Sequence, residues 1–172
     1  MKLDNLTPEQ QKEWHAMQRE NELLKEKLRQ MEVAGAGEAT TILPRPEFIR
    51  EIARLVAHDE RYGGISSLLV LSFNGLLESK PTLGNLTYGA VTIAISDCIL
   101  SNVRSCDLVG RTGSNDFSIM LTRCKIMDAE KKAQALVTAI KTKLDPLLQN
   151  KAAIGLSYTV SILNSRDDVK KA

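Results

Sequence analysis

Hydrophobic and polar positions in the larger, C-terminal part of the chain follow periods that predict alternating helices and strands. Apolar residues recur every three or four positions in 86–102, in 128–144 and in the stretch that ends near Gly63, which is typical of helices with one buried face. The run 65–72 is apolar at its centre and predicts a strand buried on both faces. Strict alternation over 154–162 predicts a strand buried on one face.

A hairpin completes the predicted sheet. The short apolar runs 108–111 and 117–122 flank the turn-forming sequence Gly113-Ser114-Asn115-Asp116. The predicted order is therefore helix, strand, helix, hairpin, helix, strand. That order favours one α/β (α+β) domain, with a single sheet and helices packed on it.

The first part of the chain has a different pattern, a polar helix with a heptad seam. The seam positions are Trp14, Met17, Asn21, Leu24, Leu28 and Met31. Asparagine at one a position favours a parallel two-stranded coiled coil and hence a homodimer, and a solvated single helix is the alternative. Ala34-Gly35-Ala36-Gly37 interrupts the helix. We therefore expect a helix over 1–34, a hinge over 35–41 and a domain over 42–172.

Composition excludes several classes of protein. With 43% hydrophobic and 26% charged residues the chain is able to form a packed core, and a net charge of +2 with 4% aromatic residues gives no nucleic-acid footprint. No apolar run is long enough for a membrane span, and the start does not resemble a signal peptide. Cys98, Cys106 and Cys124 form no CxxC pair, so we expect reduced thiols in the cytoplasm. Neither histidine has a partner at metal-ligand spacing, so we expect no metal site.

The turn sequence resembles a known signature. Gly113-Ser114-Asn115-Asp116-Phe117 is similar to the Gly-Gly-Asp/Glu-Glu-Phe hairpin of diguanylate cyclase GGDEF domains, in degenerate form. The opening Thr40-Thr41-Ile42-Leu43-Pro44-Arg45 is similar to the family's Thr-Gly-Leu-x-Asn-Arg, and the order of elements agrees as well. The resemblance covers about 40–163 and implies the ferredoxin-like sheet of nucleotide cyclases. It also implies a reaction that joins two GTP molecules into cyclic di-GMP.

The catalytic positions that the resemblance implies are altered. The family holds two metal ions with carboxylates at the end of the first buried strand and in the turn, which phosphoryl transfer requires. Here the strand ends Ser72-Phe73-Asn74 without an acid, Asn115 is neutral, and Asp116 alone is ionised. One carboxylate does not hold a magnesium pair. Ser114 also replaces the glycine that lets the backbone approach the phosphates.

The expected guanine-reading positions are altered too. The family's asparagine falls at Ser79 or Lys80, and its aspartate falls at Ala90 after Gly89. A guanine edge without partners would lose about 1–3 kcal/mol for each unpaired group. We also expect the family's last helix to be absent, because too few residues lie between the final strand and Ala172. We therefore expect no catalytic residues, no metal and no cofactor.

A second family feature is present. Arg104-Ser105-Cys106-Asp107 matches the Arg-x-x-Asp product site, the I-site, at the family's distance from the turn. The resemblance implies that arginine holds phosphate and guanine edges, while aspartate accepts from guanine. The next helix offers Lys131, with Lys132 beside it, as a further contact. The alternative is local structural use, with Arg104 at a helix end and Asp107 bonded to a nearby amide.

These expectations define two functional hypotheses. The first is a non-catalytic receptor for cyclic di-GMP that signals to a protein partner. The second is a scaffold that acts through protein contacts alone and needs no ligand. The family association suggests motility or polarity signalling in bacteria, with recruitment to a cell pole, and that is an analogy of fold.

Overall fold

The computed structural model describes residues 11, 14–23, 41–149, 152–165 and 168–171. The chain divides into two units, Met1–Ala39 and Thr40–Ala172, and each is described by itself. In the first unit, residues 14–23 are helical, and Trp14 and Met17 are 36% and 59% exposed. Leu24, Leu28, Met31 and nearly all of the expected hinge lie outside the described residues. The coiled coil therefore stays a prediction.

The second unit follows the expected order of elements and adds three short ones. In chain order the elements are β1 Ile42–Pro44, α2 Arg45–Tyr62, β2 Ser66–Asn74, α3 Lys80–Leu83, α4 Asn85–Asn102, β3 Leu108–Arg111, β4 Asp116–Leu121, α5 Ile126–Leu148, β5 Gly155–Leu163 and the 3-10 helix η2 Asp168–Lys171. The three main helices, the hairpin and both long strands lie where the sequence patterns predict them. Helix α5 is longer at both ends than the predicted 128–144.

The strands form one mixed sheet in the order β1-β3-β4-β2-β5. Strand β1 pairs with β3 in parallel, with Ile42 opposite Val109, whereas the other neighbours are antiparallel. The parallel pair places the start of α2 next to the end of β3. Both ends of β3 therefore adjoin other elements, and the candidate sites lie at these two ends.

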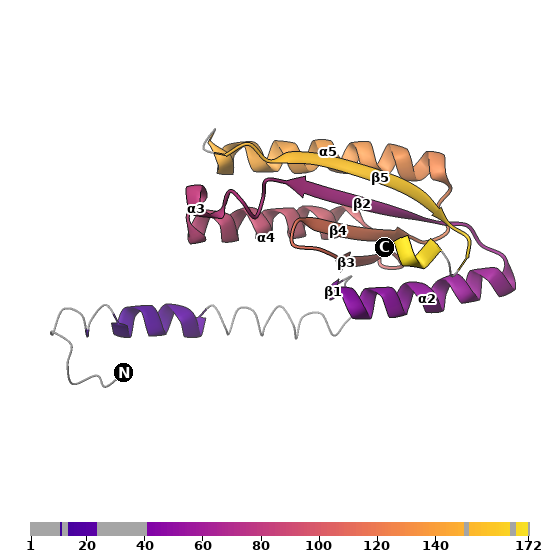
Figure 1. Cartoon of the computed structure of the whole chain (residues 1–172), viewed down its shortest axis with the longest axis horizontal. Coiled ribbons are helices and arrows are strands. Elements are labelled where there is room, and N and C mark those ends of the chain that lie inside the picture. The colour runs from indigo at the N-terminus through magenta and orange to yellow at the C-terminus, as the bar shows by residue number, and fades with distance from the viewer. Residues whose placement is uncertain (1–10, 12–13, 24–40, 150–151, 166–167, 172) are drawn as a thin grey trace. The chain divides into compact units, whose positions relative to one another are not determined.

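Helices cover both faces of the sheet (Figure 1). Helices α4 and α5 pack on one face around a buried core that includes Leu69, Leu71, Ile95, Ile119 and Leu136. Helix α2 packs on the other face through residues such as Phe48, Ile52, Val56, Leu68 and Met120. Val169 of η2, 5% exposed, joins this second cluster. The domain therefore has three layers.

The limits of α2 follow from its sequence. Pro46 lies in its first turn, where its missing amide hydrogen is not needed, and Glu47 complements the positive end of the helix. The helix ends at Tyr62, and the next residue, Gly63, has a φ of 77° that favours glycine. No helix among the described residues is both long and apolar enough to cross a membrane.

Candidate functional site: the Arg104–Asp107 turn and the hairpin

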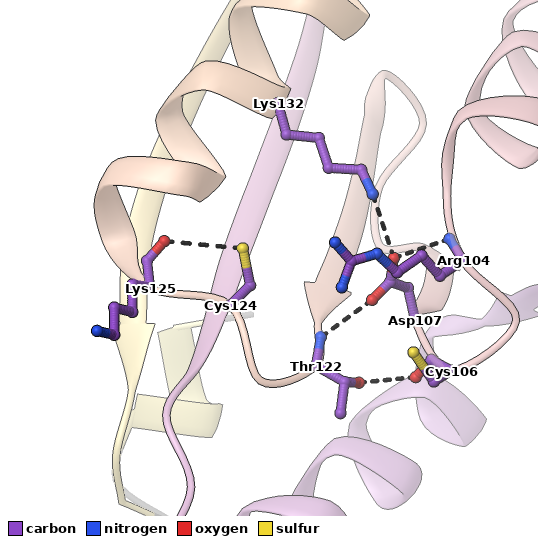
Figure 2. A network of polar contacts seen from close by, with 7 residues as sticks. All are labelled: Arg104, Cys106, Asp107, Thr122, Cys124, Lys125 and Lys132. Carbon is purple, nitrogen blue, oxygen red and sulfur yellow. Dashed lines mark hydrogen bonds and ion pairs between the residues drawn. The ribbon is translucent and has the colours of Figure 1, made fainter.

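A closed turn connects α4 to β3. The Asp107 amide donates to the Arg104 carbonyl over 3.0 Å, and the Arg104 amide donates to Asp107 Oδ2 over 2.9 Å. Helix α4 ends at Asn102, two residues before Arg104. The bond from the Arg104 amide to the Asp107 side chain therefore fixes the backbone just after the helix. Figure 2 shows side chains of this turn together with those from the connection between β4 and α5 and with Lys132 of α5.

The Asp107 carboxylate is buried and occupied. It is 2% exposed and accepts from the amides of Arg104 and Thr122, the second over 3.1 Å to Oδ1. Lys132 Nζ lies 3.4 Å from Oδ2 and forms an ion pair with it (Figure 2). A buried charge is stable when it is paired and hydrogen-bonded in this way. These three internal donors hold the Asp107 carboxylate within the turn.

Lys132 is the lysine of α5 that reaches the turn. Lys131, which the family resemblance offers as a ligand contact, is exposed on α5, and its neighbour Lys132 forms the ion pair with Asp107. Lys132 is 25% exposed at its side chain, and Arg104 is exposed, so two cations border the turn. The Thr122 hydroxyl adds a bond of 2.7 Å to the Cys106 carbonyl, which ties the turn to the end of β4.

All three cysteines are free thiols, as their spacing predicts. Burial raises the pKa of the Cys98 thiol, and burial followed by the Asp128 carboxylate raises the pKa of Cys124. Both thiols therefore stay protonated at neutral pH and are poor nucleophiles. Cys106 is exposed within the turn.

The signature hairpin is closed by its own backbone and by Asn115. The amides of Thr112 and Gly113 donate to the Asp116 carbonyl over 3.1 and 3.3 Å. Asn115 Oδ1 accepts from the Leu77 amide over 3.0 Å, and the Asn115 carbonyl accepts from Phe73 over 2.8 Å. The side chain and the backbone carbonyl of Asn115 therefore connect the hairpin to β2 and to the segment that follows it.

Few carboxylates lie near the hairpin. Asp116 pairs with Ser72 of β2, and Asn74 follows at the end of that strand. Among the described residues, no three His, Cys, Asp or Glu side chains come together as metal ligands could. A hydroxyl and two amides are weak replacements for the hard anionic oxygens that magnesium prefers.

The positions expected to read guanine are engaged elsewhere. Ser79 is 8% exposed, and its hydroxyl donates to the Leu76 carbonyl over 2.7 Å. The Lys80 amine lies 5.4 Å from the centre of the Tyr88 ring. Ala90 is exposed on α4 and carries no polar atom on its side chain.

Thr122 is a site residue that the sequence did not indicate. Its contribution is a backbone amide, which every residue type except proline offers, and it reaches Asp107 only because β4 returns beside β3. The helical period of α5 could have distinguished Lys132 from Lys131, both of which the sequence offered. Its buried stripe runs through Ala129, Ala133 and Leu136, and Lys132 flanks that stripe, whereas Lys131 points away from it.

The sequence has relatives in a family of known description. Residues 37–172 match the family described as "Diguanylate cyclase, GGDEF domain". Diguanylate cyclase DosC of Escherichia coli (strain K12) is 29% identical over 119 residues, which are 69% of this chain and 26% of the relative. The match thus spans about a quarter of the relative's length.

Solved structures share the fold. The GGDEF domain of DgcB from Caulobacter crescentus, in complex with c-di-GMP, matches with a TM-score of 0.58 at 19% identity, over 77% of this chain and 81% of that chain. Diguanylate cyclase SiaD from Pseudomonas aeruginosa, in complex with its activator SiaC, matches with a TM-score of 0.54 at 17% identity, over 90% and 60%. The mixed sheet with its flanking helices is therefore the expected cyclase-like fold, and the chain belongs to the GGDEF domain family.

Proposed function

We propose that this GGDEF domain binds cyclic di-GMP at the Arg104–Asp107 turn and does not synthesise it. The observation that carries the proposal is the convergence of two cations, Arg104 and Lys132, on a turn held by a buried carboxylate. The DgcB domain, which is similar in fold, was solved in complex with c-di-GMP. A dinucleotide with two phosphates has the charge that such a turn attracts.

Each side chain has a distinct role in the proposal. Arg104 contacts the ligand, because its planar guanidinium binds phosphate oxygens or a guanine edge through two parallel hydrogen bonds. Lys132 adds a point charge and also neutralises Asp107. Asp107 positions Arg104 through the bond from the Arg104 amide. We assign no ligand contact to Lys131.

The neutral side chains near the hairpin support the absence of synthesis. Ser72, Asn74 and Asn115 occupy the region where the family resemblance implies carboxylates that hold two metal ions. Asn115 is in addition bonded to the Leu77 amide, so its carbonyl oxygen is already in use. Because relatives are named as diguanylate cyclases, an assay for synthesis from GTP tests this part of the proposal directly.

The proposed output is a protein contact. SiaD, similar in fold, was solved in complex with its activator SiaC, which is a precedent for a protein partner. The three free thiols are compatible with the reducing cytoplasm. The N-terminal heptads would allow a homodimer to present two such domains to one partner.

A ligand-independent scaffold is the second candidate. It is favoured by the internal engagement of the Asp107 carboxylate, because a residue with three internal donors has a structural use without any ligand. The scaffold predicts that Arg104→Ala leaves partner binding and localisation intact. Leu24→Glu combined with Leu28→Glu would then abolish both.

Calorimetric titration with cyclic di-GMP separates the two candidates. We expect Arg104→Ala to weaken binding by about thirtyfold, since hydrogen bonds to charged groups contribute roughly 1.5–3 kcal/mol. Lys132→Ala should weaken binding by about fivefold, and the neighbouring Lys131→Ala, the matched control, should change it less than about twofold. A melting curve for each variant establishes that it is folded.

Two results would refute the receptor. One is no binding heat at ligand concentrations about a hundred times a micromolar dissociation constant. The other is an equal affinity for the native protein and a folded Arg104→Ala variant. Either outcome leaves the scaffold as the function.

A further inference from the structure

A cavity of about 650 Å³ lies between the β1–α2 junction and the signature hairpin. Its volume is within the range of about 300–1,000 Å³ that is usual for small-molecule sites. Ten residues line it: Ile42, Leu43, Pro44, Arg45, Leu77, Tyr88, Arg111, Thr112, Gly113 and Ser114. The cavity adjoins the end of β3, whereas the Arg104–Asp107 turn precedes the start of that strand.

Five of the ten lining residues have apolar or aromatic side chains. β1 contributes Ile42, Leu43 and Pro44, while Leu77 and the Tyr88 ring come from the segments after β2. Leu77 is 44% exposed even though it is an apolar side chain. Such a wall favours a flat apolar body, because covering it removes hydrocarbon from water on both partners.

The charged side chains that line the cavity are cations. Arg45 and Arg111 line it, together with the hydroxyl groups of Thr112 and Ser114, and no carboxylate is among the lining residues. The Lys80 amine lies above the Tyr88 ring. Glu78, next to Leu77, carries the nearest acid along that segment, and its Oε2 lies 3.5 Å from Asn115 Nδ2.

Arg111 is held in place before any ligand arrives. Its Nη2 donates to the Ser114 carbonyl over 3.2 Å, and its guanidinium lies 5.6 Å from the centre of the Phe117 ring. Pro44 of β1 lies opposite Arg111 of β3, so the apolar part of the lining is adjacent to this arginine. A guanidinium has five N–H donors, so the bond to the Ser114 carbonyl leaves other donors that can bind an anion.

We propose that this cavity binds an amphipathic organic anion, with a flat apolar body against Leu77 and Tyr88 and an acidic headgroup on Arg111. A metal–nucleotide complex would need carboxylates, and none is among the lining residues. The site goes beyond the proposed receptor function, and it uses none of the residues assigned to cyclic di-GMP.

Fluorescence titration with 8-anilino-1-naphthalenesulfonate tests this site on the full chain. We expect saturable binding of one probe per chain. Arg111→Gln and Leu77→Glu should each raise the dissociation constant at least tenfold, and Arg45→Gln should raise it about threefold. Ile93→Glu, an exposed apolar position on α4 outside the cavity, is the matched control and should leave the affinity unchanged.

N-phenyl-1-naphthylamine, which has the same body without the sulfonate, should bind at least tenfold more weakly. Equal binding of this neutral probe, or unchanged affinity in folded Arg111→Gln, would overturn the proposal. If Arg111→Gln does not fold, unchanged affinity in Arg45→Gln has the same meaning. Displacement of the probe by GTP with magnesium would assign the cavity to a nucleotide and also refute it. Arg104→Ala should not change probe binding, so this test and the test of the receptor fail independently.

Discussion

Replacing Asp107 with alanine should lower the free energy of unfolding by about 3 kcal/mol. The variant leaves two backbone amides, those of Arg104 and Thr122, without their acceptor, and it leaves Lys132 without its counter-charge. Loss of one partner from a buried pair costs about 3–5 kcal/mol, and Lys132 is partly solvated, which places the effect at the lower end. Chemical denaturation monitored by circular dichroism measures it.

Asp97→Ala is the matched control for that substitution. Asp97 is an exposed carboxylate on α4, and its removal should change the unfolding free energy by less than about 0.5 kcal/mol. If Asp107→Ala were as stable as this control, the carboxylate would not hold the turn. Its positioning role would then be lost, and a direct ligand contact at Asp107 would become the better assignment.

Gly110→Ala should destabilise the domain by about 3 kcal/mol, through close packing of α2 on the sheet. A Cβ added to Gly110 would lie 2.3 Å from Phe48 Cγ and 2.6 Å from Phe48 Cδ2. Phe48 is fully buried, so the ring has no space into which it could move. Overpacking of this kind costs about 1–3 kcal/mol and occasionally more. Thermal unfolding should show a decrease of roughly 10 °C in Tm.

Gly89→Ala should shift Tm in the opposite direction. Nothing lies within 4 Å of the Cβ that it would add, and alanine is favoured over glycine inside a helix by about 1 kcal/mol.

Phe48→Leu in the Gly110→Ala background should recover part of the loss, because it removes the ring that clashes. Equal stability of Gly110→Ala and the native protein would show that α2 packs differently.

Periodicity predicted the long elements because each one has an extended buried face. The stripe of α5 and the alternation of β5 are each repeated over several turns or residue pairs. Strand β1 was missed because its three residues have no period of their own, and pairing with β3 across more than sixty residues defines it. Helix α3, with four residues, is also too short to show a pattern.

The sequence was enough to identify candidate residues of the site, but not the contacts that these residues make. The sequence indicated Arg104 and Asp107, and it left open whether the aspartate is used by the fold or by a ligand. Its burial depends on Thr122, fifteen residues later, which the hairpin brings back. The sequence left open whether Lys131 or Lys132 supports a ligand. Lys132 is the one that pairs with Asp107, because one residue rotates a helix by about 100° and turns these two neighbours in different directions.

One measurement tests the central proposal, which is that this domain binds cyclic di-GMP and does not synthesise it. Purified protein is incubated with GTP and magnesium or manganese, or separately with cyclic di-GMP, and the nucleotides bound and free after ultrafiltration are quantified by mass spectrometry. Retention of added cyclic di-GMP, with none formed from GTP above a protein-free control, is the predicted result. Cyclic di-GMP accumulating from GTP would mean that Asp116 and its neutral neighbours support catalysis, and would contradict the account.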